Sequence, residues 1–164
     1  MALPILVLKD GTEVGYAFIK AQCPIPLDVF ISILTHESDL NQWATRYEPT
    51  FNWLCKPEAW AQSLHITAAT ETIHQKTSWG LGQIMGAVAR EEGFSGDLPS
   101  LCDPTTNIVW VCHHLRWLWA KLNGNIVEIL QAYNGGLGAV KEGRCVDYAR
   151  NILNRTEHLG YWRV

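Results

Sequence analysis

The sequence lacks a long apolar run, a leader segment and an excess of basic residues. Its longest apolar run near the start, Ala2–Leu8, is cut off by Lys9-Asp10 and is too short to span a bilayer. The run also lacks the basic region and the small-residue cleavage site of a signal peptide. The net charge is −3 and no basic patch occurs, which excludes a protein that grips nucleic acid through its phosphates. We therefore expect synthesis in the cytoplasm, no nucleic-acid partner and no stable membrane insertion.

Paired thiols and histidine metal motifs are missing as well. The five cysteines are odd in number and show no C-x-x-C spacing, which favours free buried thiols over disulfides or a zinc ribbon. His36-Glu37 does not continue into H-E-x-x-H, and no G-x-S-x-G elbow occurs. Catalysis by a Cys–His pair stays open, because such partners need not be neighbours in sequence, but no pattern supports it. No cofactor and no metal site are predicted.

The composition that remains is typical of one globular domain. A chain of 164 residues with 48% apolar and 18% charged residues can bury about two-thirds of its unfolded surface. Eight tryptophans are an unusual number, and they suit a carbohydrate-binding cleft as well as a hydrophobic core.

Hydrophobic periodicity predicts a mainly α fold. Asp10-Gly11 between the apolar stretches Pro4–Leu8 and Val14–Ile19 predicts a small N-terminal β-hairpin, with a loosely held arm as the alternative. Helical periods follow at 26–37, Pro57–Leu64, Ala68–Gln75, Leu81–Val88, 104–122, Ile126–Tyr133 and Val146–Leu153. The expected stops lie near Gly93, at Gly124, at Gly135-Gly136 and near Gly160.

Glu37 is the first candidate for chemistry. It follows Leu27, Phe30 and Leu34 at helical spacing, so its carboxyl lies on the apolar face of its helix. No Lys or Arg lies within a turn of it, and burial without a partner disfavours the carboxylate. A carboxyl kept protonated near neutral pH can act as a general acid towards a glycosidic oxygen. The alternative is a solvated charge at a helix end.

Two glycine segments are further candidates. Gly80 and Gly82 stand before a predicted helix, where glycine allows a tight turn or the close approach of a ligand. Tyr133 lies on the inward face of a helix that ends at Gly135-Gly136, which is also what an ordinary helix stop looks like.

On the long helix, four residues lie off the core face: Trp110, His113, His114 and Trp117. They are interpreted as packing against the N-terminal arm, rather than as a contact face or a sugar-stacking ledge.

The order of these segments resembles the soluble lytic transglycosylase (SLT) domain, which is related to goose-type lysozyme. The four matching motifs are Glu37-Ser38, Gly80-Leu81-Gly82-Gln83-Ile84-Met85, Ala132-Tyr133-Asn134-Gly135-Gly136 and Tyr148. The resemblance spans about Pro26 to Leu153 and is greatest to short phage-type endolysins, which are bacteriolytic enzymes. Two departures are Gly82 in place of a common Met and a long insertion between the first two motifs.

The resemblance implies a lysozyme-like α+β fold that cleaves peptidoglycan between N-acetylmuramic acid and N-acetylglucosamine (MurNAc and GlcNAc). The implied domains are an N-terminal arm or hairpin at 1–24 and a catalytic domain at 25–164. Glu37 would be the acid and then the base, Ser38 would orient it, and Tyr148 would pack against it and keep its pKa raised. Gly80, Gln83, Met85, Tyr133 and Asn134 would bind substrate. The expected protein is a monomer that acts on the cell wall after its release.

Two alternatives remain open at this point. A hydrolytic muramidase needs a second carboxylate to activate water, and Asp39, Glu48 and above all Glu71 are available. Glu71 can equally be a surface residue of an amphipathic helix. A wall-binding module that has lost its acid is the non-enzyme alternative, and the presence of Glu37 on the inward face speaks against it.

Overall fold

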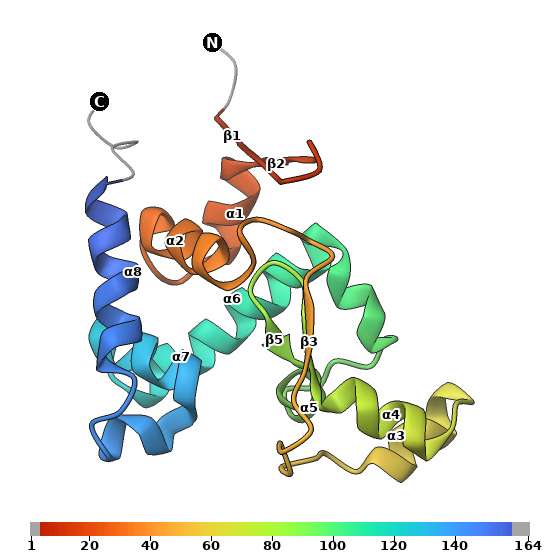
Figure 1. Cartoon of the computed structure of the whole chain (residues 1–164). Helices are drawn as coiled ribbons and strands as arrows, with labels where there is room; N and C mark the ends of the chain where they lie inside the picture. The colour runs from red at the N-terminus through yellow and green to blue at the C-terminus, as the bar shows by residue number, and fades with distance from the viewer. Residues whose placement is uncertain (1–3, 159–164) are drawn as a thin grey trace.

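The computed structural model describes residues 4–158. Within them, helices make up most of the chain, and two small antiparallel sheets are present (Figure 1). Its elements in chain order are β1 Ile5–Val7, β2 Glu13–Gly15, α1 Tyr16–Gln22, α2 Leu27–Ser38, β3 Thr45–Tyr47, α3 Pro57–Leu64, α4 Ala68–Gln75, β4 Thr77–Trp79, β5 Ile84–Met85, α5 Gly86–Glu91, the 3-10 helix η1 Leu98–Cys102, α6 Pro104–Lys121, α7 Ile126–Lys141 and α8 Val146–His158. The mainly α, α+β fold class predicted from the sequence is confirmed.

The N-terminal hairpin is present but shorter than predicted. β1 pairs with β2 so that Leu6 lies opposite Val14, and both side chains are buried in the core. The second strand ends at Gly15, and the chain enters α1 at once, so the expected strand residues up to Ile19 are helical. Ile19 is fully buried. The helix forms here instead of a longer strand because its apolar face packs into the same core as the hairpin.

Three helices, α2, α6 and α8, form the framework of the part of the molecule that holds Glu37. α6 runs through its centre, with Ile108, Val111 and Leu115 fully buried on the face opposite to the four residues that the sequence places off the core. α2 and α8 lie side by side (Figure 1), joined by a hydrogen bond of 3.1 Å between the hydroxyls of Ser32 and Thr156. These helices bring the end of α2, and with it Glu37, to the inner side of α8.

The buried face of α8 differs from the one that helical spacing predicts, which consists of Val146, Ala149 and Leu153. Val146 is 41% exposed, whereas Tyr148, Ala149 and Ile152 are buried. The first turn of α8 therefore faces α2 with its tyrosine, because the helix is rotated by about one residue from the expected phase. Gly160, the predicted stop, lies outside the described residues.

The second sheet, with the order β3-β4-β5, was not predicted at all. The apolar residues Leu81, Ile84 and Val88 predict one helix, but Ile84 and Met85 form strand β5, which pairs with β4. The helix begins only at Gly86. Nearby, α3 and α4 have the predicted bounds, at Pro57–Leu64 and Ala68–Gln75.

The predicted stop at Gly135-Gly136 is a kink rather than an end. α7 continues to Lys141, and Gly136 adopts a φ of 71° and a ψ of 173° within it. All five cysteines are free thiols in this structure; Cys102 and Cys112 are buried, and the other three are half-buried. Across residues 4–158, no single helix is long and apolar enough to cross a membrane; α1 and α2 reach that length and composition only as a pair bent by 100°.

Candidate active site

The carboxyl of Glu37 lies one residue before the end of α2, where the phenol of Tyr148 reaches it from α8. The Tyr148 hydroxyl donates a hydrogen bond of 2.6 Å to Oε1 of Glu37. The ring of His36 meets the same tyrosine edge to face, with 5.1 Å between the ring centroids. The structure thus brings together two candidate residues that stand 111 positions apart in the chain.

Burial raises the pKa of Glu37 above its ordinary value, and three groups act against this rise. The largest of them is the hydrogen bond from Tyr148, followed by the charges of His36 and Arg46. A donor stabilises the carboxylate more than the neutral acid, so the Tyr148 hydroxyl lowers the pKa of Glu37. The two parts of Tyr148 thus act on this pKa in opposite directions: its ring helps to dehydrate the carboxyl, and its hydroxyl stabilises the carboxylate.

The loop between β4 and β5 is held by internal hydrogen bonds. Asn107, fully buried on α6, donates to the carbonyls of Trp79 (2.9 Å) and Leu101 (2.7 Å) and accepts from the Gly82 N–H (2.9 Å). Gly80 has a φ of +70°, and an added Cβ would lie 2.3 Å from Nδ2 of Asn107. Gly80 therefore serves the turn and its packing, because its backbone is buried and faces protein rather than an open cleft.

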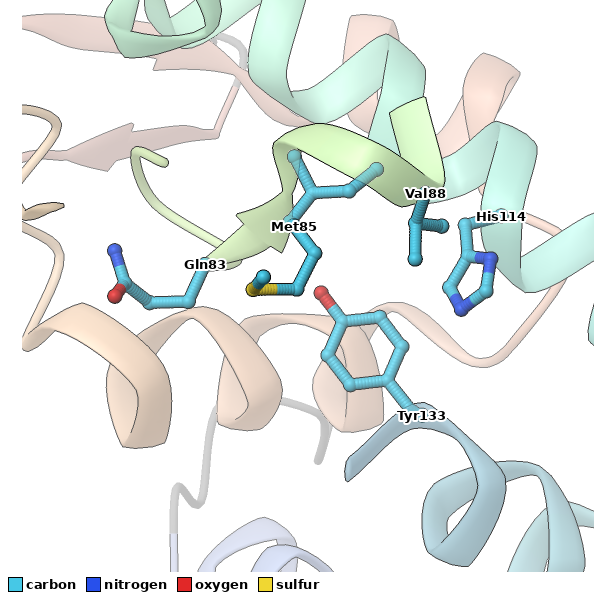
Figure 2. Close-up of a pocket in the computed structure, with 6 residues that line it drawn as sticks. Gln83, Met85, Val88, His114 and Tyr133 are labelled. Carbon is cyan, nitrogen blue, oxygen red and sulfur yellow. The ribbon is translucent and has the colours of Figure 1, made fainter. Parts of the chain in front are cut away.

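A small pocket of about 60 Å³ lies beside this loop (Figure 2). Its lining residues are Gln83, Ile84, Met85, Val88, His114 and Tyr133. Figure 2 shows Tyr133 directed from α7 towards Met85, and its hydroxyl donates a hydrogen bond of 2.5 Å to the Gly82 carbonyl. Burial raises the pKa of Tyr133 well above its ordinary value, and the charge of Glu37 adds to the effect. Three of the candidate substrate-binding residues therefore share one pocket, and Glu37 is close enough to influence it.

Gln83 is fixed in a left-handed backbone conformation, with a φ of 50°. Its amide nitrogen donates to the carbonyls of Ala44 and Gly80, both at 2.9 Å, and its amide oxygen accepts from the Ser78 hydroxyl at 3.0 Å. These bonds tie β4, β5 and the segment before β3 together. Gln83 is thus held rigidly at the mouth of the pocket.

Two candidates lie apart from this arrangement. The Ser38 hydroxyl donates to the Leu34 carbonyl of its own helix at 3.1 Å, so it does not orient the Glu37 carboxyl in this structure. Asn134 is exposed next to Tyr133 and does not line the pocket.

Glu71 is neither a surface residue nor a free second carboxylate, and both expectations are corrected. It is fully buried and forms a two-point ion pair with Arg90, at 2.7 Å from Nε to Oε1 and 3.1 Å from Nη2 to Oε2. Gln75 donates a further bond of 2.9 Å to Oε1. The Arg90 guanidinium also stacks on Trp60, 4.5 Å from the ring centroid. With both oxygens engaged, Glu71 is in no position to activate a water molecule.

The residues off the core face of α6 pack elsewhere than expected. Trp110 lies against Phe94, at 5.2 Å between ring centroids, rather than against the N-terminal arm. His113 and His114 both bond to the carboxylate of Glu92. Sequence reasoning named His114 but favoured packing over a sugar contact for it, whereas the structure places it in the pocket lining. That reasoning gave Asn107 no role. The one signal for Asn107 was its spacing, because it stands four residues before Val111 on the buried face of α6.

No group of three or more His, Cys, Asp or Glu side chains within residues 4–158 is placed to hold a metal ion.

A search among curated proteins and a search among solved structures return no match. The sequence profile of the transglycosylase SLT domain family matches residues 18–155, which include Glu37, the pocket loop, Tyr133 and Tyr148. The chain therefore belongs to the transglycosylase SLT domain family, and it is a peptidoglycan-cleaving enzyme of the lytic transglycosylase class.

Proposed function

We propose that this enzyme cleaves the β-1,4 bond between MurNAc and GlcNAc, with Glu37 as the general acid and then the general base. The observation that carries the proposal is the Glu37 carboxyl, which is dehydrated enough to have a raised pKa and is held in position by Tyr148. A carboxyl in that state can donate a proton to a leaving oxygen at neutral pH. It can then accept one when the second step needs a base.

The reaction needs no second carboxylate. Glu37 gives its proton to the glycosidic oxygen, and the bond from that oxygen to the anomeric carbon of MurNAc breaks. The 6-hydroxyl of the same MurNAc forms the new bond to the anomeric carbon and returns its proton to Glu37. The products are a free GlcNAc hydroxyl and a 1,6-anhydro end, with no water consumed. An internal nucleophile held in place can replace an activated water.

The hydrolytic alternative has less support. An inverting muramidase needs a carboxylate about 6.5–9.5 Å from the acid to activate water. Glu71 is buried in its pair with Arg90, and the carboxylates of Asp39 and Glu48 are paired with Lys9 and Arg46. Each of the three candidates therefore already has a cationic partner within the fold.

We further propose a biological role as a phage-type endolysin, made in the host cytoplasm and acting on the wall after release. This rests on the resemblance of the four motifs to such enzymes. Lysis of cells that express the protein together with a membrane-permeabilising partner, and no lysis without that partner, is the expected result.

Glu37→Gln tests the chemistry directly. The amide is isosteric but carries no acidic proton, so wall clearing should fall by a factor on the order of 10²–10⁴. The measurement is loss of turbidity of purified cell walls, with the melting temperature as the control for folding. Asp39→Asn is the matched control, because it removes an exposed carboxylate only two positions away. It should leave turbidity loss unchanged.

Mass spectrometry of the released fragments then separates the two reactions. An anhydro end is lighter than a reducing end by one water. Anhydro ends from the wild type, together with an inactive Glu37→Gln, are expected. Reducing ends would overturn the transglycosylase route, and an active Glu37→Gln would overturn the role of Glu37.

A further inference from the structure

His114 lines the pocket but belongs to none of the four motifs. It comes from α6, whereas Gln83 and Met85 come from the loop and β5, and Tyr133 comes from α7. Figure 2 shows its ring beside Val88 and near Tyr133, with 5.7 Å between the His114 and Tyr133 ring centroids. The imidazole is therefore part of the pocket wall, where a bound ligand could contact it.

One nitrogen of this imidazole is fixed by a carboxylate. Nδ1 of His114 lies 2.6 Å from Oε1 of Glu92, whose side chain is only 9% exposed. The other oxygen of Glu92 lies 3.1 Å from Nδ1 of His113. Because a carboxylate only accepts hydrogen bonds, the Nδ1 of each ring carries the proton. A carboxylate that fixes tautomer and ring orientation in this way is a recurrent device in functional sites.

The opposite nitrogen is left for a ligand. Nε2 of His114 makes no hydrogen bond to any residue among 4–158. In the neutral ring it is an acceptor with its lone pair in the plane of the imidazole. Trp117 stacks on the outer side of the ring, at 5.9 Å and 14°, so the ring is held on that side as well.

We propose that His114 is a substrate-binding residue that accepts a hydrogen bond at Nε2 from a hydroxyl or amide N–H of a saccharide of the glycan strand, with Glu92 as its positioning residue. This inference rests on the proposed function and adds a contact outside the four motifs. It gives the strand a polar anchor at the α6 end of the pocket.

The lining of the pocket favours a sugar over the peptide stem. Ile84, Met85 and Val88 offer apolar surface for the C–H faces of a pyranose ring, and Tyr133 offers an aromatic one. None of the lining residues is Lys or Arg, so a peptide carboxylate would find no cationic partner there. A fixed acceptor beside these apolar side chains matches the hydroxyl-rich edge of a saccharide.

The test measures binding without turnover, in a Glu37→Gln background, by calorimetry with peptide-free glycan strands. His114→Asn places an amide near the Nδ1 position and lacks an atom at Nε2, so it should bind the strands about 3- to 10-fold more weakly. His114→Gln places an amide near the Nε2 position, and its affinity should lie close to that of the parent. His113→Asn is the matched control, because His113 bonds to the same carboxylate but is 46% exposed and outside the pocket.

Glu92→Ala tests the positioning role in the otherwise wild-type enzyme. Loss of ring orientation should raise KM several-fold and leave kcat unchanged, whereas a merely structural loss would lower the melting temperature and the apparent kcat, through the folded fraction, and leave KM unchanged. Equal affinity of folded His114→Asn and its parent for the strands would overturn the inference. So would an effect of His114→Asn on free stem peptides alone. An active Glu37→Gln would instead overturn the proposed function, so the two failures are distinguishable.

Discussion

Tyr148 acts on Glu37 in two opposing ways, and one substitution separates them. Its ring helps to bury the carboxyl, which raises the pKa of Glu37, and its hydroxyl donates to Oε1, which lowers that pKa. Tyr148→Phe keeps the ring and removes the donor, so the pKa of Glu37 should rise further. A general acid works below its pKa, and the alkaline limb of the activity profile should therefore move to higher pH.

Activity against cell walls, measured as a function of pH, checks this. Tyr47→Phe is the control, because Tyr47 is 52% exposed and its variant should leave the limb in place. Tyr148→Phe should also reduce maximal activity, since the carboxyl loses the bond that holds it, at a cost in folding stability of about 1 kcal/mol. A limb that moves to lower pH would mean that the hydroxyl favours the protonated acid.

Gly80 illustrates a residue whose importance is internal to the fold. An added Cβ would lie 2.3 Å from Asn107 Nδ2 and 2.4 Å from the Leu101 carbonyl, and the φ of +70° disfavours any side chain. Gly80→Ala should destabilise the protein by about 2–4 kcal/mol. Thermal unfolding measures this, with Gly138→Ala as the control in a helix where added bulk meets only a side chain at 3.8 Å. Equal stability of the two variants would contradict the packing argument.

The residue scale also shows where sequence reasoning works and where it fails. Glu37 was found because its place on the apolar face of a helix depends on spacing alone. The opposing effect of the Tyr148 hydroxyl on the pKa of Glu37 could not be predicted, because it depends on which atom donates at 2.6 Å across 111 residues of sequence. The pocket position of His114 could not be predicted for the same reason: its partner Glu92 belongs to a different element.

Among the elements, α4 and α5 are joined by a buried charge pair, Glu71 with Arg90. Glu71→Gln would leave the Arg90 guanidinium buried without its counter-charge, which costs about 3–5 kcal/mol of folding free energy. Activity should then be lost by unfolding, with kcat per folded molecule unchanged at a temperature below the melting transition. Chemical denaturation gives the stability. A stable but inactive Glu71→Gln would return this residue to the catalytic site.

The helices and strands were predicted correctly where local sequence signals determine the element, and wrongly where pairing with another strand determines it. α3 and α4 have the predicted bounds because Pro57 and Thr67 mark their starts and the sequence between is periodic. Ile84 and Met85 fit the same period, but their backbone groups pair with β4, and a contact with another strand overrides local spacing. The glycine pair in α7 gives the same local signal as a helix stop, but the helix resumes after Gly136, whose φ is 71°.

At the scale of the whole molecule, the N-terminal hairpin shares one hydrophobic core with α2 and α6. Leu8 is 3% exposed and belongs to the same apolar cluster as Ile33 and Leu115. Leu8→Ala should therefore destabilise the entire fold by about 2–5 kcal/mol in one cooperative transition. Ile5→Ala, at 43% exposed in the adjoining strand, should change stability by no more than about 0.5 kcal/mol. A separate early transition for Leu8→Ala would show that the hairpin is an independent arm.

The span of 111 residues between Glu37 and Tyr148 has a consequence for the newly made chain. Synthesis proceeds from the N-terminus at about 5–20 residues per second, so α2 leaves the ribosome well before α8 exists. Until α8 docks, the Glu37 carboxyl stays in water and keeps the acidity of an ordinary glutamate. Catalytic competence should thus arise in one step at the end of folding, and a ribosome-bound chain that has emerged only as far as α7 would be inert towards the wall.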